Sequence, residues 1–408
     1  MKFLSNIIYS QKPFNSGEII LFLLIYASED TMLFGTFGSS TYNMIKYVVL
    51  VGVLLFMLFK KTNVKKESIV LLGLLTILFV ISAFLSGWLK IGFVYNILLL
   101  LTAIIFASRY SISLFKESFC RIVVFLSIYS LVIYFLNLSL PSSLSFFPTE
   151  YNVVGNEFKN CIFSVTFTSL PFRNFGIFRE PGVFMVFLNT ALFFEWFSSK
   201  SSAQRIFIYI LTLLTTVSTA GVVIGALILA GGAIYRKQAK NVFIALPLVI
   251  FAYYIINSED YIYGALLLDK IADGGSGTAE VRYASIIIPL KISFSSPFGV
   301  GPDAFDDLFP KYSAQLYGES YDGSLATATF FKMLAVNGIM VFTFYFWAFL
   351  RFVKKAFSNH YLRILFFIVL FLAFGNEDMR VSMLFNIMIA YGIVGNEKRS
   401  KSYKIINV

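Results

Sequence analysis

The sequence predicts an all-α polytopic membrane protein with about twelve transmembrane helices. Of its 408 residues, 58% are hydrophobic and only 13% are charged, which is too little charge to cover the surface of a soluble domain of this size. Apolar runs of membrane-spanning length recur from one end of the chain to the other. The N-terminal stretch shows no short apolar region followed by a small-residue cleavage site, so we expect the first span to remain as an uncleaved anchor.

The apolar runs divide the chain into predicted helices and two long hydrophilic segments. We expect residues 1–408 to form one integral membrane domain, with a first large outer segment at 138–180 and a second at 258–338. The predicted spans, in chain order, are 17–35, 42–59, 68–86, 91–107, 118–137, 181–198, 205–218, 219–235, 241–257, 339–353, 361–375 and 381–396.

The distribution of lysine and arginine predicts the orientation. Twenty-two of the 33 basic residues fall in alternate connections and at the two chain ends, which places these segments and both termini in the cytoplasm. Seventeen of the 22 acidic residues fall on the opposite side or in the outer halves of spans. The net charge of +11 is therefore mostly a signal of topology, and it does not argue for a nucleic-acid partner.

The first outer segment ends in a cluster of charge at the mouth of a helix. In PFRNFGIFREPGVF, Arg173, Arg179 and Glu180 stand among aromatic residues, and a Pro-Gly pair opens the next apolar run. Charge at the edge of the hydrocarbon is costly, so such a cluster indicates a functional site that faces protein or water. The alternative interpretation is a local ion pair between Arg179 and Glu180, with the glutamate near the positive end of the helix.

The second outer segment is the longest hydrophilic part of the chain. It carries Glu280, Arg282 and Lys291 in AEVRYASIIIPLKISF, where Pro289 is expected to kink or break a helix. The run 285–295 is too short to span a membrane and too apolar for open solvent. We therefore expect a helix that lies at the outer interface or re-enters under protein cover. In the alternative interpretation, its two basic side chains only reach out to lipid phosphates.

The residues that are missing narrow the chemistry. The single histidine, His360, falls in a predicted cytoplasmic loop, and Cys120 and Cys161 fall toward opposite faces, where they are not expected to pair. The acidic cluster that begins at Asp303 matches no calcium-loop spacing, and no glycine loop for a nucleotide phosphate is present. We therefore expect no metal and no cofactor. Arginine remains, and its guanidinium group binds phosphate oxygens through two parallel bonds, which suits a diphosphate.

Four segments in the second half of the chain resemble those of Wzy-type O-antigen polymerases, members of the O-antigen polymerase and ligase superfamily. FRNFGIFREPGVFMVF is similar to the segment that enters a central span in that family, and STAGVVIGALILA is similar to the small-residue span that follows. VRYASIIIPLKISFSSPFGVGPDAF resembles the family's arginine-helix-Pro-x-Gly-x-Gly segment, and FKMLAVNGIMVFTFYF ends the series in the same order. The resemblance covers about residues 170–350, while the first five spans match only in hydrophobicity.

The resemblance implies a metal-independent membrane glycosyltransferase of the all-helical type. Such an enzyme transfers a growing glycan from undecaprenyl diphosphate onto a lipid-linked repeat unit at the outer face of the bacterial inner membrane. By matching position, Arg179 and Arg282 would hold the diphosphate and stabilise it as it leaves, with Arg173 and Lys291 as supporting cations. The implied partners are the lipid-linked oligosaccharide, the lipid bilayer and, as a further protein to consider, a chain-length regulator.

The residue that removes the proton from the acceptor hydroxyl stays open at this point. Glu180, Glu280 and Asp303 are the candidates, and the sequence does not choose among them. Many members of the superfamily, the ligases especially, have a His-Asn pair where this chain reads Asp322-Gly-Ser-Leu. The departure favours a polymerase over a ligase, and it leaves Asp322 as a substitute for the histidine.

Two other classes of protein are retained as alternatives: a polysaccharide ligase of the same fold and a flippase for lipid-linked oligosaccharides. An outer cavity faced by Arg179 and Arg282 would favour the enzyme, whereas a central cavity lined by Lys46 and Lys332 would favour transport. Two further acidic pairs are interpreted as parts of solvated turns; they are Glu29-Asp30 and, with Arg380 nearby, Glu377-Asp378.

Overall fold

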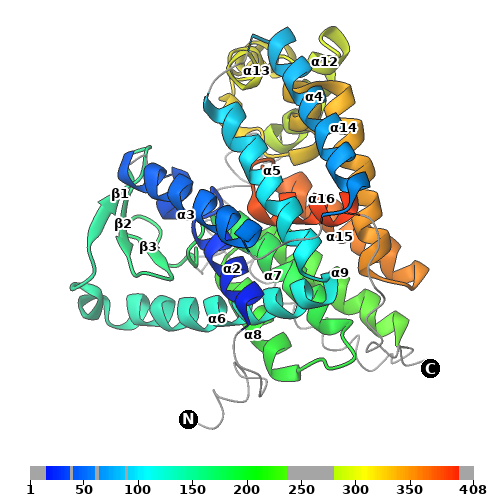
Figure 1. Cartoon of the computed structure of the whole chain (residues 1–408). Helices are drawn as coiled ribbons and strands as arrows, with labels where there is room; N and C mark the ends of the chain where they lie inside the picture. Colours follow the sequence, from blue (N-terminus) through cyan, green and yellow to red (C-terminus); the bar gives the residue numbers. More distant parts are fainter. Residues whose placement is uncertain (1–14, 37–39, 60–63, 88–90, 237–279, 395–408) are drawn as a thin grey trace.

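The computed structural model describes residues 15–36, 40–59, 64–87, 91–236 and 280–394, and most of these are helical (Figure 1). Helices lie at eleven of the twelve predicted positions. The predicted span 241–257, the first part of the second outer segment and both chain ends lie outside the described residues. The helices, in chain order, are α2 (Ser16–Tyr26), α3 (Ser40–Phe59), α4 (Lys66–Leu85), α5 (Ile91–Arg109), α6 (Ile112–Ser139), α7 (Pro181–Trp196), α8 (Ala203–Thr215), α9 (Thr219–Tyr235), α12 (Val281–Ser295), α13 (Pro302–Tyr317), α14 (Thr329–Ala356), α15 (His360–Asn376) and α16 (Met383–Ile393).

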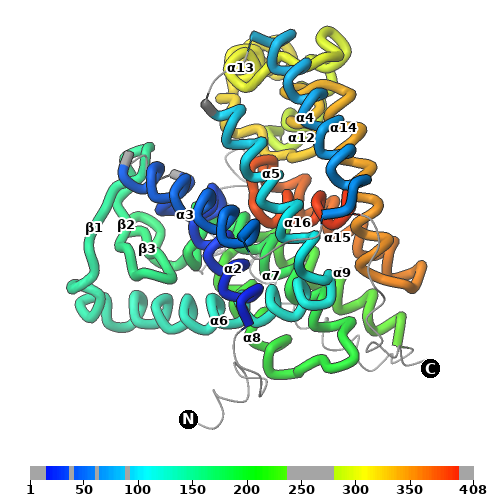
Figure 2. Tube along the Cα trace, in the orientation of Figure 1, coloured from blue at the N-terminus to red at the C-terminus, as the bar shows by residue number. Residues whose placement is uncertain are grey.

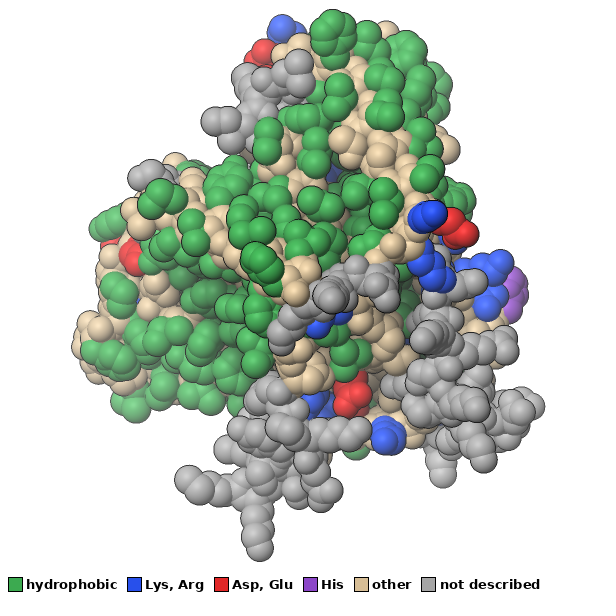
Figure 3. Space-filling view, in the orientation of Figure 1, with side chains coloured by type: hydrophobic (Ala, Val, Ile, Leu, Met, Phe, Trp, Pro, Cys, Tyr) green, Lys and Arg blue, Asp and Glu red, His purple; other side chains and the backbone are tan. Residues whose placement is uncertain are grey.

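Several helices are suited to a membrane. Within the described residues, α3, α4, α5, α6 and α14 are long and apolar enough to cross one, and six shorter helices are also apolar. Only 28% of the most apolar stretch of α3 and of α4 is buried inside the protein, against 67% for α6. Figure 3 shows a broad hydrophobic face over these helices, with charged side chains at its margins. An apolar surface of this extent suits lipid chains, and the chain is therefore a helical membrane protein.

Two short apolar helices, α7 and α16, form the centre of the fold (Figure 2). Every residue of both helices is buried. A helix that is hydrophobic all round is stable only where other elements cover it on every side. α7 packs against α6, α8, α9 and α15, while α16 packs against α5 and α14. The chain segments that lead into these two helices are consequently attached to fully buried elements.

The first outer segment contains a small antiparallel sheet that the sequence analysis did not predict. Its strands are β1 (Thr149–Tyr151), β2 (Glu157–Asn160) and β3 (Val165–Phe167), in the order β1-β2-β3. Phe158 pairs with Glu150 on one side and with Phe167 on the other. Phe158, Val165 and Phe167 bury their side chains against Met32 and Phe34, so this hydrophobic cluster joins the segment to the start of the chain. The all-α prediction therefore holds for the spans and fails for this segment.

The second outer segment folds over α14. Its described part contains α12, α13 and a short 3-10 turn at Gly323–Leu325. The predicted helix break at Pro289 does not occur, because α12 continues through this residue. Ala284, Ile288 and Ile292 form the buried face of α12, while Tyr283 and Phe294 remain exposed. One covered face and one open face are consistent with the predicted interfacial position.

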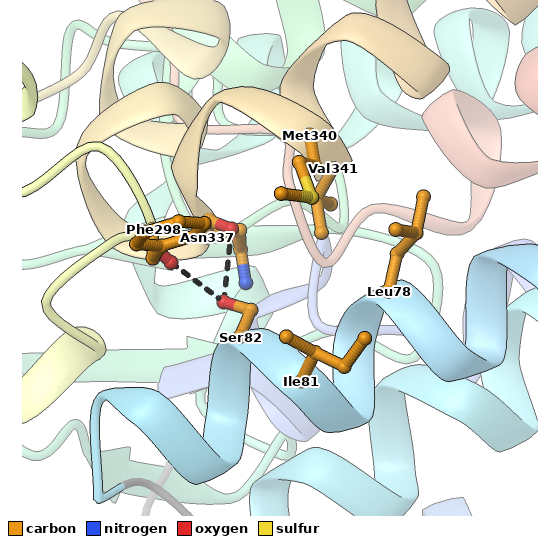
Figure 4. Close-up of a pocket in the computed structure, with 7 residues that line it drawn as sticks. All are labelled: Leu78, Ile81, Ser82, Phe298, Asn337, Met340 and Val341. Atoms are coloured by element: carbon orange, nitrogen blue, oxygen red, sulfur yellow. Dashed lines mark hydrogen bonds between the residues drawn. The ribbon is translucent and has the colours of Figure 1, made fainter.

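A glycine-dependent junction joins this segment to a break in α14. Gly338 has a φ of +80° inside α14, so the helix divides into 329–337 and 339–356. The segment 297–301 pairs with the break through backbone hydrogen bonds, such as that from the Gly301 N–H to the Val336 carbonyl at 3.0 Å. From α4, the Ser82 hydroxyl donates to the Asn337 carbonyl at 2.9 Å (Figure 4). A Cβ atom on Gly338 would lie 2.3 Å from the Phe298 carbonyl carbon, so only glycine allows this approach.

Candidate functional site

The two predicted arginine segments meet at one turn, formed by residues 376–380 between α15 and α16. The Arg179 Nη2 donates to the Asp378 carbonyl at 2.6 Å. The Arg282 Nη1 donates to both the carbonyl (3.2 Å) and the side-chain oxygen (2.6 Å) of Asn376. The interpretation of this turn as solvated is wrong, because only 6% of Glu377 is exposed. Arginines from two distant segments therefore hold the turn immediately before and immediately after Glu377.

The start of α7 is built to bring Glu377 close. Pro181 occupies the first helical position, where its missing N–H costs no hydrogen bond, and Gly182 follows. A Cβ atom on Gly182 would lie 1.6 Å from Oε1 of Glu377, so the carboxylate rests where a larger residue would have its side chain. Glu180 is the N-cap residue, and its side chain accepts no capping hydrogen bond. The Pro-Gly pair thus admits the Glu377 carboxylate to the positive end of the helix.

Arg179 is positioned by the connection that follows α2. The Arg179 N–H donates to the Asp30 carbonyl at 3.0 Å, next to a β-bridge between Thr31 and Phe178. Asp30 is 2% exposed and its carboxylate accepts from the Ser382 hydroxyl at 2.8 Å, so the solvated-turn interpretation is wrong here too. The predicted first span 17–35 is interrupted after Tyr26, because the hydroxyls of Ser28 and Thr31 bond to backbone carbonyls of the last helical turn.

We use the term arginine face for the group formed by Arg173, Arg179, Glu180, Arg282 and Glu377. Burial raises the pKa of Glu377 and so does the neighbouring Glu180, while Arg179, Arg282 and Arg173 lower it, and the result is about 8. Burial lowers the pKa of Arg173. The Nε atoms of Arg173 and Arg179 are buried and have no hydrogen-bond partner among the described residues. The arginine face therefore contains two buried N–H donors that form no hydrogen bond within the described residues.

We use the term aspartate face for the group formed by Asp378 and Arg380 of the same turn and Lys332 of α14. Arg380 donates to both oxygens of Asp378, at 2.9 Å and 2.8 Å, and the Lys332 Nζ lies 3.3 Å from Oδ2. Lys332 also donates to the Gly323 carbonyl at 3.1 Å. Burial alone would raise the pKa of Asp378, but the charges of Arg380 and Lys332 outweigh it and hold the pKa well below its usual range. Both oxygens of the Asp378 carboxylate therefore have a positively charged partner.

The other predicted site residues belong to the second outer segment. Glu280 accepts from the Tyr321 hydroxyl at 2.8 Å, and the Lys291 Nζ lies 4.8 Å from the centre of the Tyr312 ring. Asp303 is exposed in the first turn of α13. Asp322 accepts from the Ser324 N–H at 2.7 Å, and hydrogen bonding by the Ser324 side chain and then by its backbone lowers the pKa of Asp322. The structure thus brings together four predicted residues, Arg173, Arg179, Glu180 and Arg282, and adds Glu377, which the sequence analysis had set aside.

An open cavity of about 100 Å³ lies beside the aspartate face. Its polar lining comes from Arg380 and three asparagines, Asn96, Asn337 and Asn386, with Phe79 and Tyr345 among its aromatic residues. The side-chain amides of Asn96 and Asn337 form no hydrogen bond within the described residues. Arg179 and Arg282 do not line this cavity, and neither do Lys46 and Lys332. The cavity itself therefore does not decide between the enzyme and the transporter.

The chain was compared with known families, curated proteins and solved structures. No family model, no curated protein and no solved structure matches it. The fold and the charged turn define a helical membrane protein with a partly buried cluster of arginines and carboxylates.

Proposed function

We propose that the protein is a membrane glycosyltransferase that polymerises a lipid-linked glycan. It would transfer the growing chain from undecaprenyl diphosphate onto a lipid-linked repeat unit at the outer face of the bacterial inner membrane. The observation that carries the proposal is the meeting of Arg173, Arg179 and Arg282 around one buried turn. Guanidinium groups bind phosphate oxygens in pairs of parallel bonds and cannot lose their charge, so this arrangement suits a diphosphate.

The arginine face also supports the chemistry of the leaving group. When a glycosyl diphosphate reacts, negative charge accumulates on the diphosphate, and cations already in place stabilise it without reorganisation. Arg282 is exposed and accessible to a ligand, while Arg179 is fixed by its bond to Asp378. The N-terminus of α7, which opens beside Glu180, adds the positive end of a helix to the same place.

The lining of the cavity beside Arg380 is suited to binding a sugar. Its asparagine amides offer both donors and acceptors, which match the hydroxyl groups of a neutral glycan, and its aromatic residues offer flat apolar surfaces for a sugar ring. On this proposal the diphosphate binds the arginine face and sugars extend past the turn toward the cavity.

The two alternatives gain less support. Both lysines that would have favoured a transporter are engaged in ion pairs, Lys46 with Glu29 and Lys332 with Asp378. A ligase that relies on an outer histidine has no such residue in this chain, since His360 is the only histidine and falls in a predicted cytoplasmic loop.

The proposal is tested with Arg282→Ala in a host whose own copy of the gene is deleted. We expect the variant to abolish long-chain polysaccharide, while the single repeat unit is still made and exported. The measurement is the length distribution of the polysaccharide on a gel. Arg351→Ala is the matched control, because Arg351 lies over Trp347, far along α14 from the turn, and its loss is expected to leave the distribution unchanged. An unchanged chain length in Arg282→Ala would overturn the proposal.

A further inference from the structure

We propose that Glu377 is the proton acceptor of this reaction, the carboxylate that takes the proton from the attacking hydroxyl of the acceptor sugar. The inference rests on the proposed function and names the residue that it leaves open. It also replaces the three candidates of the sequence analysis, Glu180, Glu280 and Asp303.

The first argument is position. Arg179 donates a hydrogen bond to the carbonyl of Asp378, and Arg282 donates to Asn376. The two arginines that would hold the diphosphate therefore bind the residues on either side of Glu377. A diphosphate bound by these arginines would therefore lie close to the Glu377 carboxylate. A general base has to be within hydrogen-bond reach of the group it deprotonates, and the turn that carries Glu377 also binds both arginines that would hold the diphosphate.

The second argument is availability. The Glu377 carboxylate accepts no hydrogen bond from the residues that the structure describes, although it is buried. By contrast, Asp378 is held by Arg380 and Lys332, and Glu280 accepts from Tyr321. Glu180 is exposed to solvent beside the same arginines. Among the carboxylates of the arginine face, Glu377 is the buried one that keeps both oxygens open for a substrate.

The electrostatic surroundings suit the role. The charged groups that act on Glu377 are Glu180 at the start of α7, Arg173 and Arg179 in the preceding loop, and Arg282 on α12, with Asp378 next to it in the turn. Burial and Glu180 raise the pKa of Glu377 to about 8 against the three arginines. A base whose pKa lies near the working pH combines a usable ionised fraction with a strong affinity for the proton.

The step balances without any further reactant. The acceptor hydroxyl oxygen bonds to the anomeric carbon of the donor sugar, and the bond between that carbon and the diphosphate oxygen breaks. The diphosphate leaves with the electron pair, held by the arginines, and the hydroxyl proton moves to Glu377. Water then takes this proton and restores the ionised carboxylate for the next transfer.

The test compares Glu377→Gln and Glu377→Asp with Arg282→Ala in purified protein reconstituted in vesicles. Glu377→Gln is expected to lower the rate of polymer formation by about 10²–10⁴-fold, while binding of undecaprenyl diphosphate is retained. Glu377→Asp is expected to keep part of the activity, and its rate should still rise as the pH increases, because the base must be ionised. Glu157→Gln, which removes a carboxylate from β2 in the outer sheet, is the matched control and should behave like wild type.

The outcomes separate this inference from the proposed function. Wild-type polymer formation by Glu377→Gln, together with an inactive Arg282→Ala, would overturn the inference and leave the function standing. An active Arg282→Ala would overturn the function itself. If Glu377→Gln loses undecaprenyl diphosphate binding as strongly as turnover, or if Glu377→Asp shows no increase in rate with pH, Glu377 is not the proton acceptor.

Discussion

Glu377 and Asp378 are neighbours in one turn, Glu377 buried and Asp378 half-buried, and their pKa values move in opposite directions. Burial raises the pKa of each, yet Glu377 reaches about 8 while Asp378 is held well below its usual range. The difference lies first in the charges of Arg380 and Lys332, which form ion pairs with Asp378, and then in direct hydrogen bonds. Arg380 donates to both oxygens of Asp378, whereas the arginines near Glu377 donate to backbone and amide oxygens beside it and leave its carboxylate open.

The comparison separates a structural carboxylate from an available one. A buried charge is tolerated when ion pairs and hydrogen bonds surround it, and Asp378 has both. Glu377 has nearby positive charge without a direct partner, which is the arrangement expected where a substrate supplies the missing contact. Two adjacent acidic residues can therefore play different parts, since one fixes the turn and the other faces the ligand.

The largest effect is expected from Asp378→Asn. The substitution leaves Lys332 and Arg380 without their charged partner, and breaking such a buried pair costs about 3 kcal/mol of folding free energy or more. We expect less folded protein in the membrane and a lower unfolding temperature in detergent. Glu377→Gln, measured in parallel at pH 7, should unfold near the wild-type temperature. Equal losses in the two variants would remove the distinction between the two carboxylates.

The next largest effect is expected from Arg179→Lys. Lysine can still donate to the Asp378 carbonyl, but a point charge cannot provide the paired donors of a guanidinium group. We expect polymer formation to decrease by about 10²–10³-fold with little change in stability. The measurement is polymer length on a gel together with the unfolding temperature. Full activity in this variant would reduce Arg179 to a structural support for the turn.

Much of the fold could be predicted from the sequence. A helix in contact with lipid or packed on all sides has to be apolar along its length, so the positions of α3 to α9 and of α14 to α16 could be recognised. The outer sheet was missed because strands of three and four residues carry little periodic signal. The end of α2 at Tyr26 was also missed, although Ser28 and Thr31 held the signal for it.

The candidate site could be predicted only in part. The family resemblance implied that Arg179 and Arg282 would act together, and the structure brings both to the 376–380 turn. Glu377 and Asp378 were taken for a solvated turn because acidic residues between apolar helices usually face water. The turn is held by Arg179, 199 residues from Asp378, and by Arg282, 94 residues from Asn376, and such contacts leave no local pattern. The one sequence feature that pointed to this contact was Gly182. A glycine is needed at this position because the Glu377 carboxylate packs against it.

Gly182→Ala tests the position of the Glu377 carboxylate without changing any charge. The new methyl group would lie 1.6 Å from Oε1, so the flexible glutamate side chain has to move. Alanine also favours the helix over glycine by up to about 1 kcal/mol, so stability should not decrease. We expect polymer formation to fall by about 10²-fold, because a shift of about 1 Å in a reacting group costs that much.

Gly52→Ala in α3 is the matched control for this prediction. No atom lies within 4 Å of the added Cβ there, and the residue is exposed. Its polymer length distribution should remain that of the wild type. Normal activity in Gly182→Ala would show that the carboxylate position is unimportant, and the comparison between the two carboxylates would lose its functional meaning.

The smallest effect is expected in the pH dependence of stability, and it has a definite sign. The pKa of Glu377 rises from 4.5 in the unfolded chain to about 8 in the folded protein, so the folded state binds more protons between these values. Stability must therefore fall as the pH rises from about 4.5 to about 8, and no further contribution from this residue is lost above that range. Asp378 acts in the opposite sense, but only near and below its ordinary pKa of 3.8.

We expect the wild-type unfolding temperature to be lower at pH 9 than at pH 6, and the decrease to be smaller in Glu377→Gln, because glutamine does not titrate. Parallel curves for the two proteins would mean that Glu377 is already ionised in the folded state, which would make it a second paired carboxylate like Asp378.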